Sequence, residues 1–137
     1  MKIKILTIKE VEHIAFRLAK ELMKYNEPIP DYTTRYPNIL ESCIATPFSG
    51  YYNGLIQESA ILFYLIIKNH PFQNGNKRIA ITILFTFLYK NKKWLKVGLD
   101  ELYDFTMWIA NSPAKSKNEV VKAIEEFVKN KIVNLNL

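Results

Sequence analysis

The residues whose types and spacing could do chemistry lie in one short polar segment, NHPFQNGNKRIA (residues 69–80), between two strongly apolar segments. Its adjacent cations, Lys77 and Arg78, fall in the first turn of the helix that should follow. A helix N-terminus carries partial positive charge, so cations there cost roughly a few tenths of a kcal/mol each. An anion held by backbone N–H groups, the ammonium and the guanidinium would resolve this conflict. The alternative, two side chains that only extend into solvent, leaves their placement unexplained.

Other residues of the segment fit a phosphate site. Gly75 can adopt positive φ and lets the backbone approach a phosphate closely, and Asn76 offers an amide able to cap the helix. His70 precedes Pro71, which ends the previous helix because proline has no N–H donor. A neutral imidazole there could take the proton from a hydroxyl that attacks the phosphate. Without a phosphate site, a histidine that caps the helix C-terminus would explain His70 better.

The same segment holds one candidate metal-side residue and one apolar residue. Phosphoryl transfer needs charge neutralisation, which a metal ion that bridges the phosphates usually supplies. Asn74 could give Mg²⁺ an oxygen ligand, although a carboxylate would bind Mg²⁺ better. Phe72, between two polar residues, is expected to be a buried wedge that fixes the connector.

These residues must be positioned by the apolar segments on either side, which predict two central helices. Residues 55–69 have a helical period and are nearly apolar on all sides, which indicates a buried helix. A second helix is expected from Gly75 or Asn76 to Asn91. A connector of about six residues makes two such helices pack as an antiparallel pair. The polar residues of the connector should therefore lie where two helix ends meet.

The N-terminal part of the chain predicts two more helices. A capping box at residues 7–10 starts a helix that should end near Tyr25. Pro37 suits the first position of a short helix that stops before Pro47. Residues 46–54 (TPFSGYYNG) predict either a loop or a small two-stranded flap.

The C-terminal part predicts one short strand and two helices. The strand is expected within residues 92–97, and the helices at residues 100–110 and 117–131. Ser116 should cap the last helix, since Glu119 follows it at the capping-box spacing.

Length and composition limit the class of protein. With 137 residues, the chain should form one domain over residues 1–137. The net charge of +6 favours an anionic partner, although lysines scattered along a chain are usually a solvated face. The longest uncharged apolar run, residues 79–89, is too short to span a bilayer, and the first residues do not read as a signal peptide. The single cysteine, Cys43, suits a reducing compartment, so a cytoplasmic location without a membrane partner is expected.

Residues 70–78, HPFQNGNKR, resemble the signature of the Fic/Doc family, and specifically its Doc (death-on-curing) branch. That signature reads His-x-Phe-x-Asp/Asn-Ala/Gly-Asn-Lys-Arg and is matched at every specified position. Residues 35–48, RYPNILESCIATPF, look like the upstream Arg…Leu-Glu-Ser segment of the family. Fic proteins proper have Gly in place of Lys77 and a second Arg in place of Ile81. Doc-type proteins share both departures.

The resemblance implies an all-α fold, a compact Fic/Doc-type helical bundle with a central antiparallel helix pair. It also implies an enzyme that uses ATP or another nucleoside triphosphate, with Mg²⁺, to phosphorylate a protein hydroxyl. Doc-type proteins modify a threonine of elongation factor Tu and so halt translation. They are toxins that a small antitoxin neutralises by folding its C-terminal segment onto them.

Carried over by position, the resemblance makes His70 the general base and Asn74 the metal-side residue. It assigns the phosphates to Gly75 (through its backbone), Asn76, Lys77 and Arg78. The family places a target-docking flap at the position of residues 46–54, which would assign the target to Tyr51 and Tyr52. Phe48, in the same segment, is expected to pack against the core instead.

Two other functions stay open. One is AMP transfer as in Fic proteins proper, against which Lys77 and the missing second Arg count. The other is a non-catalytic basic module that binds RNA or a protein. Its only candidate surface is YKNKKWLK (residues 89–96), which an exposed loop-to-strand segment explains as easily. Nucleic acid is therefore not the expected partner.

Overall fold

Helices dominate residues 3–22, 37–72 and 75–135, which are the residues that the computed structural model describes. The helices in chain order are α1 (Ile8–Leu22), α2 (Pro37–Ala45), α3 (Gly54–Asn69), α4 (Asn76–Lys90), α5 (Leu99–Asn111) and α6 (Lys117–Lys131). Between them lie two 3₁₀ turns, η3 (Thr46–Phe48) and η4 (Ala114–Ser116). One antiparallel pair of short strands is formed by β1 (Lys93–Leu95) and β2 (Ile132–Asn134). The predicted all-α fold is confirmed.

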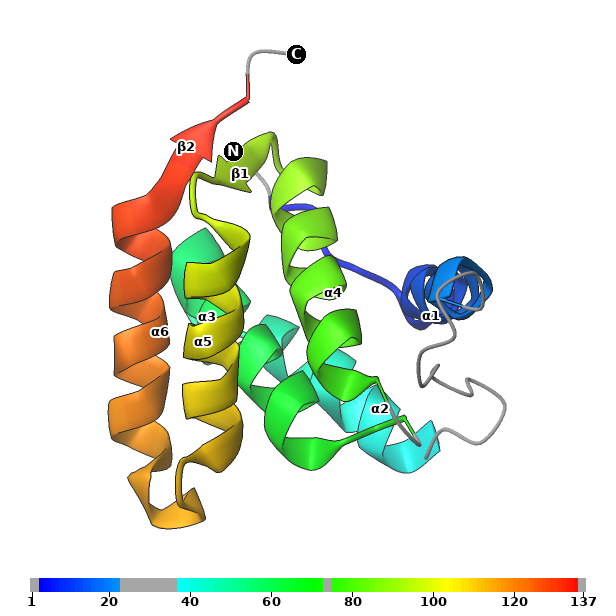
Figure 1. The fold of residues 1–137 in the computed structure, drawn as a ribbon, viewed down its shortest axis with the longest axis horizontal. Helices are drawn as coiled ribbons and strands as arrows, with labels where there is room; N and C mark the ends of the chain where they lie inside the picture. The colour runs from blue at the N-terminus through cyan, green and yellow to red at the C-terminus, as the bar shows by residue number, and fades with distance from the viewer. Residues whose placement is uncertain (1–2, 23–36, 73–74, 136–137) are drawn as a thin grey trace.

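The antiparallel pair α3 and α4 lies at the centre of the molecule, as predicted (Figure 1). Ten consecutive residues of α3, Glu58–Ile67, are buried. Neighbours on all sides make this possible, because α2, η3, α4, α5 and α6 all pack against α3. Each fully buried Leu, Ile or Phe side chain contributes about 1.5–3 kcal/mol. The end of α3 is therefore a rigid support for the connector that follows it.

The predicted capping box starts α1. The Thr7 N–H donates to Glu10 Oε1 (3.0 Å), and the Glu10 N–H donates to Thr7 Oγ1 (3.2 Å). Lys90 of α4 donates to both carboxylate oxygens of Glu10 (2.8 and 2.9 Å) and to the Ile5 carbonyl (2.8 Å). The start of α1 is thus joined to the end of α4.

Residues 46–54 contain no strand, so the loop alternative is confirmed and the two-stranded flap is wrong. Here η3 is followed by bends at residues 49–52. Pro47 is buried in η3 and has no N–H to donate to a neighbouring strand. Phe48 packs edge-on against Phe87 of α4 with ring centroids 5.3 Å apart, as expected for a core contact. The two strands form elsewhere: β1 lies within the predicted segment, and its partner β2 was not predicted.

Ser116 does not cap α6, contrary to the prediction. Its side chain makes no capping hydrogen bond, and its φ of −94° and ψ of 14° are not the extended conformation of a capping serine. Its N–H donates instead to the Pro113 carbonyl (3.0 Å), because the chain enters α6 through η4.

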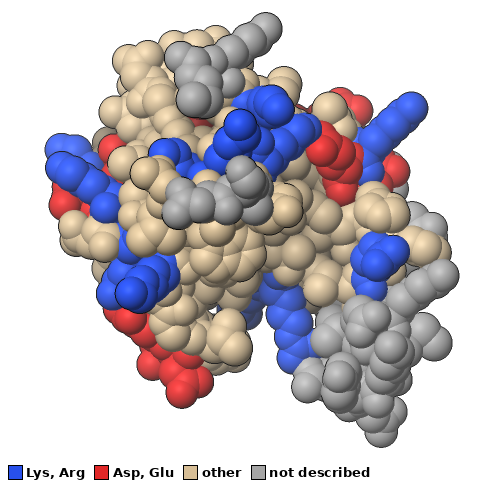
Figure 2. Space-filling model, turned by 90° about the horizontal axis from the view of Figure 1, so that it is seen from above, with Lys and Arg blue, Asp and Glu red and all other residues tan. Residues whose placement is uncertain are grey.

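The surface carries the excess of positive charge in several separate groups. Figure 2 shows Lys and Arg side chains distributed over the end of the molecule that carries β1 and β2, with other residues between them. Among the described helices, none is both long and apolar enough to cross a membrane.

Glu10 predicts a pH dependence of stability. Burial acts to raise its pKa, but hydrogen bonds from Lys90 and Thr7 outweigh that effect and hold the pKa below its usual value. A carboxyl group of this kind stabilises the fold above its unfolded-state pKa, about 4.3, and loses that contribution as pH falls through the lower folded-state pKa. The two side chains are 31% (Lys90) and 38% (Glu10) exposed, so the ion pair should contribute only about 0.2–1 kcal/mol.

Urea unfolding at a series of pH values measures this contribution. Glu10→Gln should flatten the loss of stability below about pH 5 relative to the wild type. Lys90→Gln should also reduce the pH dependence of stability in this range, though only in part. The free energy of unfolding of the double variant should be little lower than that of Glu10→Gln alone. If Glu10→Gln lost stability at low pH as steeply as the wild type, the Glu10–Lys90 pair would not be the cause of that loss.

Candidate functional site

Asn76 ties the two sides of the connector together through its side chain. Its Oδ1 accepts a hydrogen bond from the Phe72 N–H (3.0 Å), and its Nδ2 donates to the Phe72 carbonyl (2.9 Å). We call this pair of bonds the clamp. Asn76 is 8% exposed and Phe72 only 1%, so the clamp is shielded from water. The amide therefore holds the connector in place and does not cap the helix, and Phe72 is the buried wedge that the sequence predicts.

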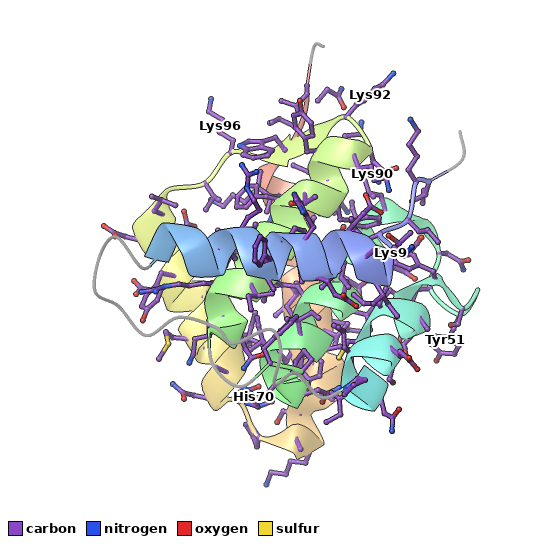
Figure 3. All side chains as sticks on the ribbon, turned by 90° about the vertical axis from the view of Figure 1, so that its right-hand side faces the viewer. Lys9, Tyr51, His70, Lys90, Lys92 and Lys96 are labelled. Atoms are coloured by element: carbon purple, nitrogen blue, oxygen red, sulfur yellow. The ribbon has the colours of Figure 1, made fainter. Side chains whose placement is uncertain are left out.

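His70 ends α3 in a left-handed conformation, with φ 47° and ψ 60°. For a residue other than glycine this conformation costs roughly 1–2 kcal/mol. The buried residues that follow, Pro71 and Phe72, hold the backbone there. The imidazole itself lies on an exposed residue, at the end of the molecule where Figure 3 labels it. The histidine is thus fixed through its backbone and accessible through its side chain.

The start of α4 has the geometry of an anion site. Gly75 has φ 72° and ψ 14°, which glycine adopts without strain. The first hydrogen bond of the helix runs from the Ile79 N–H to the Gly75 carbonyl (2.9 Å), so the N–H groups of residues 76–78 precede the helical ladder. The first turn contains no acidic residue. Lys77, partly buried, and Arg78, exposed, add their charges to the helix dipole.

A hollow of about 210 Å³ opens at this helix start. Its lining residues are Gly75, Asn76, Lys77, Arg78 and Tyr103. Pockets that enclose a whole small molecule usually measure about 300–1,000 Å³, so this hollow suits the phosphate part of a ligand.

Tyr103 is the member of this site that sequence reasoning missed. It lies on α5 and is 54% exposed. The only signal in the sequence was a large aromatic at an exposed position of an amphipathic helix, and this signal names no partner. The packing of α5 beside the central helix pair brings Tyr103 to the start of α4.

Lys68 joins the end of α3 to the end of α5. Its ammonium donates to the Ala110 carbonyl (3.2 Å) and to the Ser112 carbonyl. A cation at a helix C-terminus is stabilised by the helix dipole. Because Lys68 lies two residues before His70, the last turn of α3 fixes both α5 and the histidine.

Tyr51 and Tyr52, the predicted target-docking residues, lie apart from the helix start. Their rings meet edge-to-face with centroids 5.0 Å apart, and Tyr51 is 82% exposed. Burial, and to a smaller extent the neighbouring Tyr51, raises the pKa of Tyr52. Both tyrosines line a groove of about 790 Å³ with residues of α6 that include Lys117 and Lys122. Figure 3 shows Tyr51 well separated from His70.

Two other chemistries find little support in the described residues. Burial raises the pKa of the Cys43 thiol to about 11, although a hydrogen bond from Asn69 acts to lower it. Its Sγ also donates to the Leu65 carbonyl (3.6 Å), so the thiol is an unreactive core group. Within residues 3–22, 37–72 and 75–135 no group of three His, Cys, Asp or Glu could hold a metal ion. Asn74, the predicted metal-side residue, lies outside the described residues.

The clamp should be worth a measurable part of the stability. Asn76→Ala removes both hydrogen bonds and leaves a buried N–H and carbonyl of Phe72 without partners, which should cost about 2–4 kcal/mol. Asn76→Asp cannot donate to the carbonyl and should also destabilise the protein. Guanidinium unfolding measures both, with Asn118→Ala on the exposed start of α6 as a control that changes stability by less than about 0.5 kcal/mol. A loss in Asn76→Ala no larger than in the control would contradict the clamp.

Comparison with known proteins places these residues in a family context. A model of the Fic/DOC family matches residues 5–88. The match runs from the segment before α1 into α4, so it includes the clamp, His70 and the helix start with Lys77 and Arg78. A search of curated proteins found no match to the chain.

Proposed function

The chain belongs to the Fic/DOC family, whose members are typically transferases that modify proteins, and we propose that it is a Doc-like kinase. In this proposal it moves a phosphoryl group from a nucleoside triphosphate to a protein hydroxyl. The observation that carries it is the geometry of an anion site at the start of α4, which the clamp ties to Phe72, two residues after the exposed His70. Phosphoryl transfer is favoured over AMP transfer by Lys77 and Ile81, which replace the Gly and second Arg of Fic proteins proper.

The first turn of α4 would hold the phosphates. Backbone N–H groups of residues 76–78 can donate to phosphate oxygens, while the Lys77 ammonium and the Arg78 guanidinium neutralise their charge. Because the amide of Asn76 is committed to Phe72, its contribution to phosphate binding would come from the backbone. Tyr103 lines the hollow from α5 and would bound the space left to the ligand.

His70 would act as the general base. The target hydroxyl attacks the γ-phosphorus, and its proton passes to the neutral imidazole. The bond between the γ-phosphorus and the bridging oxygen breaks, and ADP leaves with negative charge that Lys77 and Arg78 stabilise. Mg²⁺ bound to the phosphates would supply further positive charge, with Asn74 proposed on the metal side.

The target and partners belong to the same proposal. We propose that the target docks over Tyr51 and Tyr52, where the exposed ring and the adjoining groove offer a contact surface. The Doc resemblance suggests a threonine of elongation factor Tu as the target, a small antitoxin as the inhibitor, and the cytoplasm as the location.

The reaction can be tested by incubating the chain with a cell extract and ATP labelled at the α or the γ position. Transfer of the γ label to a protein, abolished in His70→Ala, is the expected result, because the attacking hydroxyl then lacks its base. Transfer of the α label would establish AMP transfer instead, in which the α-phosphorus is attacked and pyrophosphate leaves. If neither label is transferred by the wild type, both enzyme functions are wrong.

Nucleotide binding can be tested separately by calorimetry. Lys77→Ala should weaken ATP binding roughly 10- to 100-fold, because a charge-assisted hydrogen bond contributes about 1.5–3 kcal/mol. His70→Ala should keep the affinity, since the base contacts the hydroxyl and not the phosphates. Lys115→Ala removes the same charge from η4 and serves as the matched control. If Lys77→Ala and Lys115→Ala bound ATP with equal affinity, the phosphates would not bind at the start of α4.

A further inference from the structure

The end of the molecule opposite the candidate site carries exposed lysines that the proposed function does not use. Lys92 follows α4, Lys96 follows β1, and Lys4 lies in the segment before α1; all three are exposed. Figure 3 shows Lys92 and Lys96 at one end of the molecule and His70 at the other, with α1 crossing between them. A helix rises about 1.5 Å per residue, so the 15 residues of α4 separate the two ends by about 20 Å.

Hydrogen bonds bring these lysines together from distant parts of the sequence. The Lys4 N–H donates to Asn91 Oδ1 (2.8 Å), and Asn91 Nδ2 donates to the Lys4 carbonyl (2.9 Å). The Lys96 N–H donates to the Lys131 carbonyl (2.8 Å), which extends the pairing of β1 with β2. Three chain segments thus converge on one end of the fold.

Two acidic groups near this end are paired with lysines. Glu10 pairs with Lys90 (2.8 Å), and Glu101 pairs with Lys131 (3.1 Å). These pairs cancel in charge and leave the remaining cations in excess.

Lys4, Lys92 and Lys96 make no ion pair with any acidic residue that the structure describes. Residues 91–98, which connect α4 to α5, contain no acidic residue, and the next acids along the chain are Asp100 and Glu101 in the first turn of α5. Figure 2, which looks onto this end, shows basic side chains spread over it among uncharged surface, with acidic side chains beside some of them. The surface is therefore suited to a polyanion.

Two exposed aromatic side chains lie in the same segment. Tyr89 is 52% exposed and Trp94 is 38% exposed. Trp94 rests on Phe85 with ring centroids 4.5 Å apart at an interplanar angle of 41°, and it meets Tyr89 edge-on at 6.3 Å. The indole is thus supported from the side of α4 and partly open to solvent.

Lys92 adds an independent observation. It adopts a left-handed conformation, φ 62°, just after α4, and its N–H donates to the Tyr89 carbonyl (2.9 Å). Glycine is the usual residue at this position of a helix end, because a side chain there is strained. A cation where glycine would be more stable agrees with a binding role for its side chain.

We propose that Lys4, Tyr89, Lys92, Trp94 and Lys96, called the basic end, bind single-stranded nucleic acid. Cations follow the phosphates and open aromatic faces stack with unpaired bases, the combination found in sequence-tolerant single-strand binding. An acidic protein segment would use the charges and leave the aromatics without a role. The sequence alone did not favour this partner, because it shows neither the approach of Lys4 nor the pairing that neutralises the nearby acids.

The test is a titration of the full chain into a labelled oligouridylate of about 12 nucleotides, at low and at raised salt. We expect a Kd on the order of 10 µM that weakens as salt increases. Oligodeoxythymidylate should bind within about threefold, because the contacts use phosphates and bases. His70→Ala should bind as the wild type does, so the result does not depend on the proposed kinase activity.

Single-residue variants separate the contribution of charge to oligonucleotide binding from that of base stacking. Lys92→Gly should fold at least as stably as the wild type, weaken binding about threefold or more, and lower the salt slope by about one. Lys115→Gly removes the same charge at η4 and should leave the affinity and the salt slope unchanged. Tyr89→Ala should weaken binding about fivefold or more through lost stacking. In a Trp108→Phe background, the oligonucleotide should quench the emission of Trp94.

Three outcomes would overturn the proposal. The first is equal affinity of Lys92→Gly and Lys115→Gly. The second is duplex binding as tight as single-strand binding without quenching of Trp94, which would reduce the surface to non-specific charge. The third is binding of oligoglutamate as tightly as oligouridylate, which would make an acidic protein the better partner.

Discussion

The two hydrogen bonds between Asn76 and Phe72 are the constraint on which the candidate site depends. They join Phe72, within the connector, to Asn76, the first residue of α4, and both residues are buried. The packing of α3 against α4 sets where the two helix ends lie, and these bonds fix the connector between His70 and the N–H groups of α4. Catalysis by positioning requires such a fixed relation, because small displacements of a base from its phosphate cost much of the rate.

The site is strained locally and supported by the packing around it. His70 takes a left-handed conformation, and two cations lie in the first turn of α4, where the dipole disfavours them. The burial of α3 on all sides supplies the stability that these departures reduce. Backbone strain of this kind is common at functional sites, where the surrounding structure determines the conformation.

Helix α4 has basic residues at both ends, and the physical meaning of the two ends differs. At its C-terminus Lys90 is favoured by the dipole and paired with Glu10, so part of the charge there is structural. At its N-terminus Lys77 and Arg78 act against the dipole, which points to an anionic ligand. The net charge of +6 therefore combines structural cations with cations suited to binding, and only their positions distinguish the two.

The sequence by itself determined the helices and the turn that joins them, because these follow from local periodicity, proline and glycine. The central pair, its connector and the wedge Phe72 were predicted for this reason. Tertiary structure decided the rest: the amide of Asn76 bonds to Phe72, and Tyr103 comes from α5 to the same hollow. It also decided that residues 46–54 form no strand, because Pro47 is buried in η3 and the two described strands pair elsewhere, β1 with β2. Such contacts join residues far apart in the chain, so no local pattern of residue types can specify them.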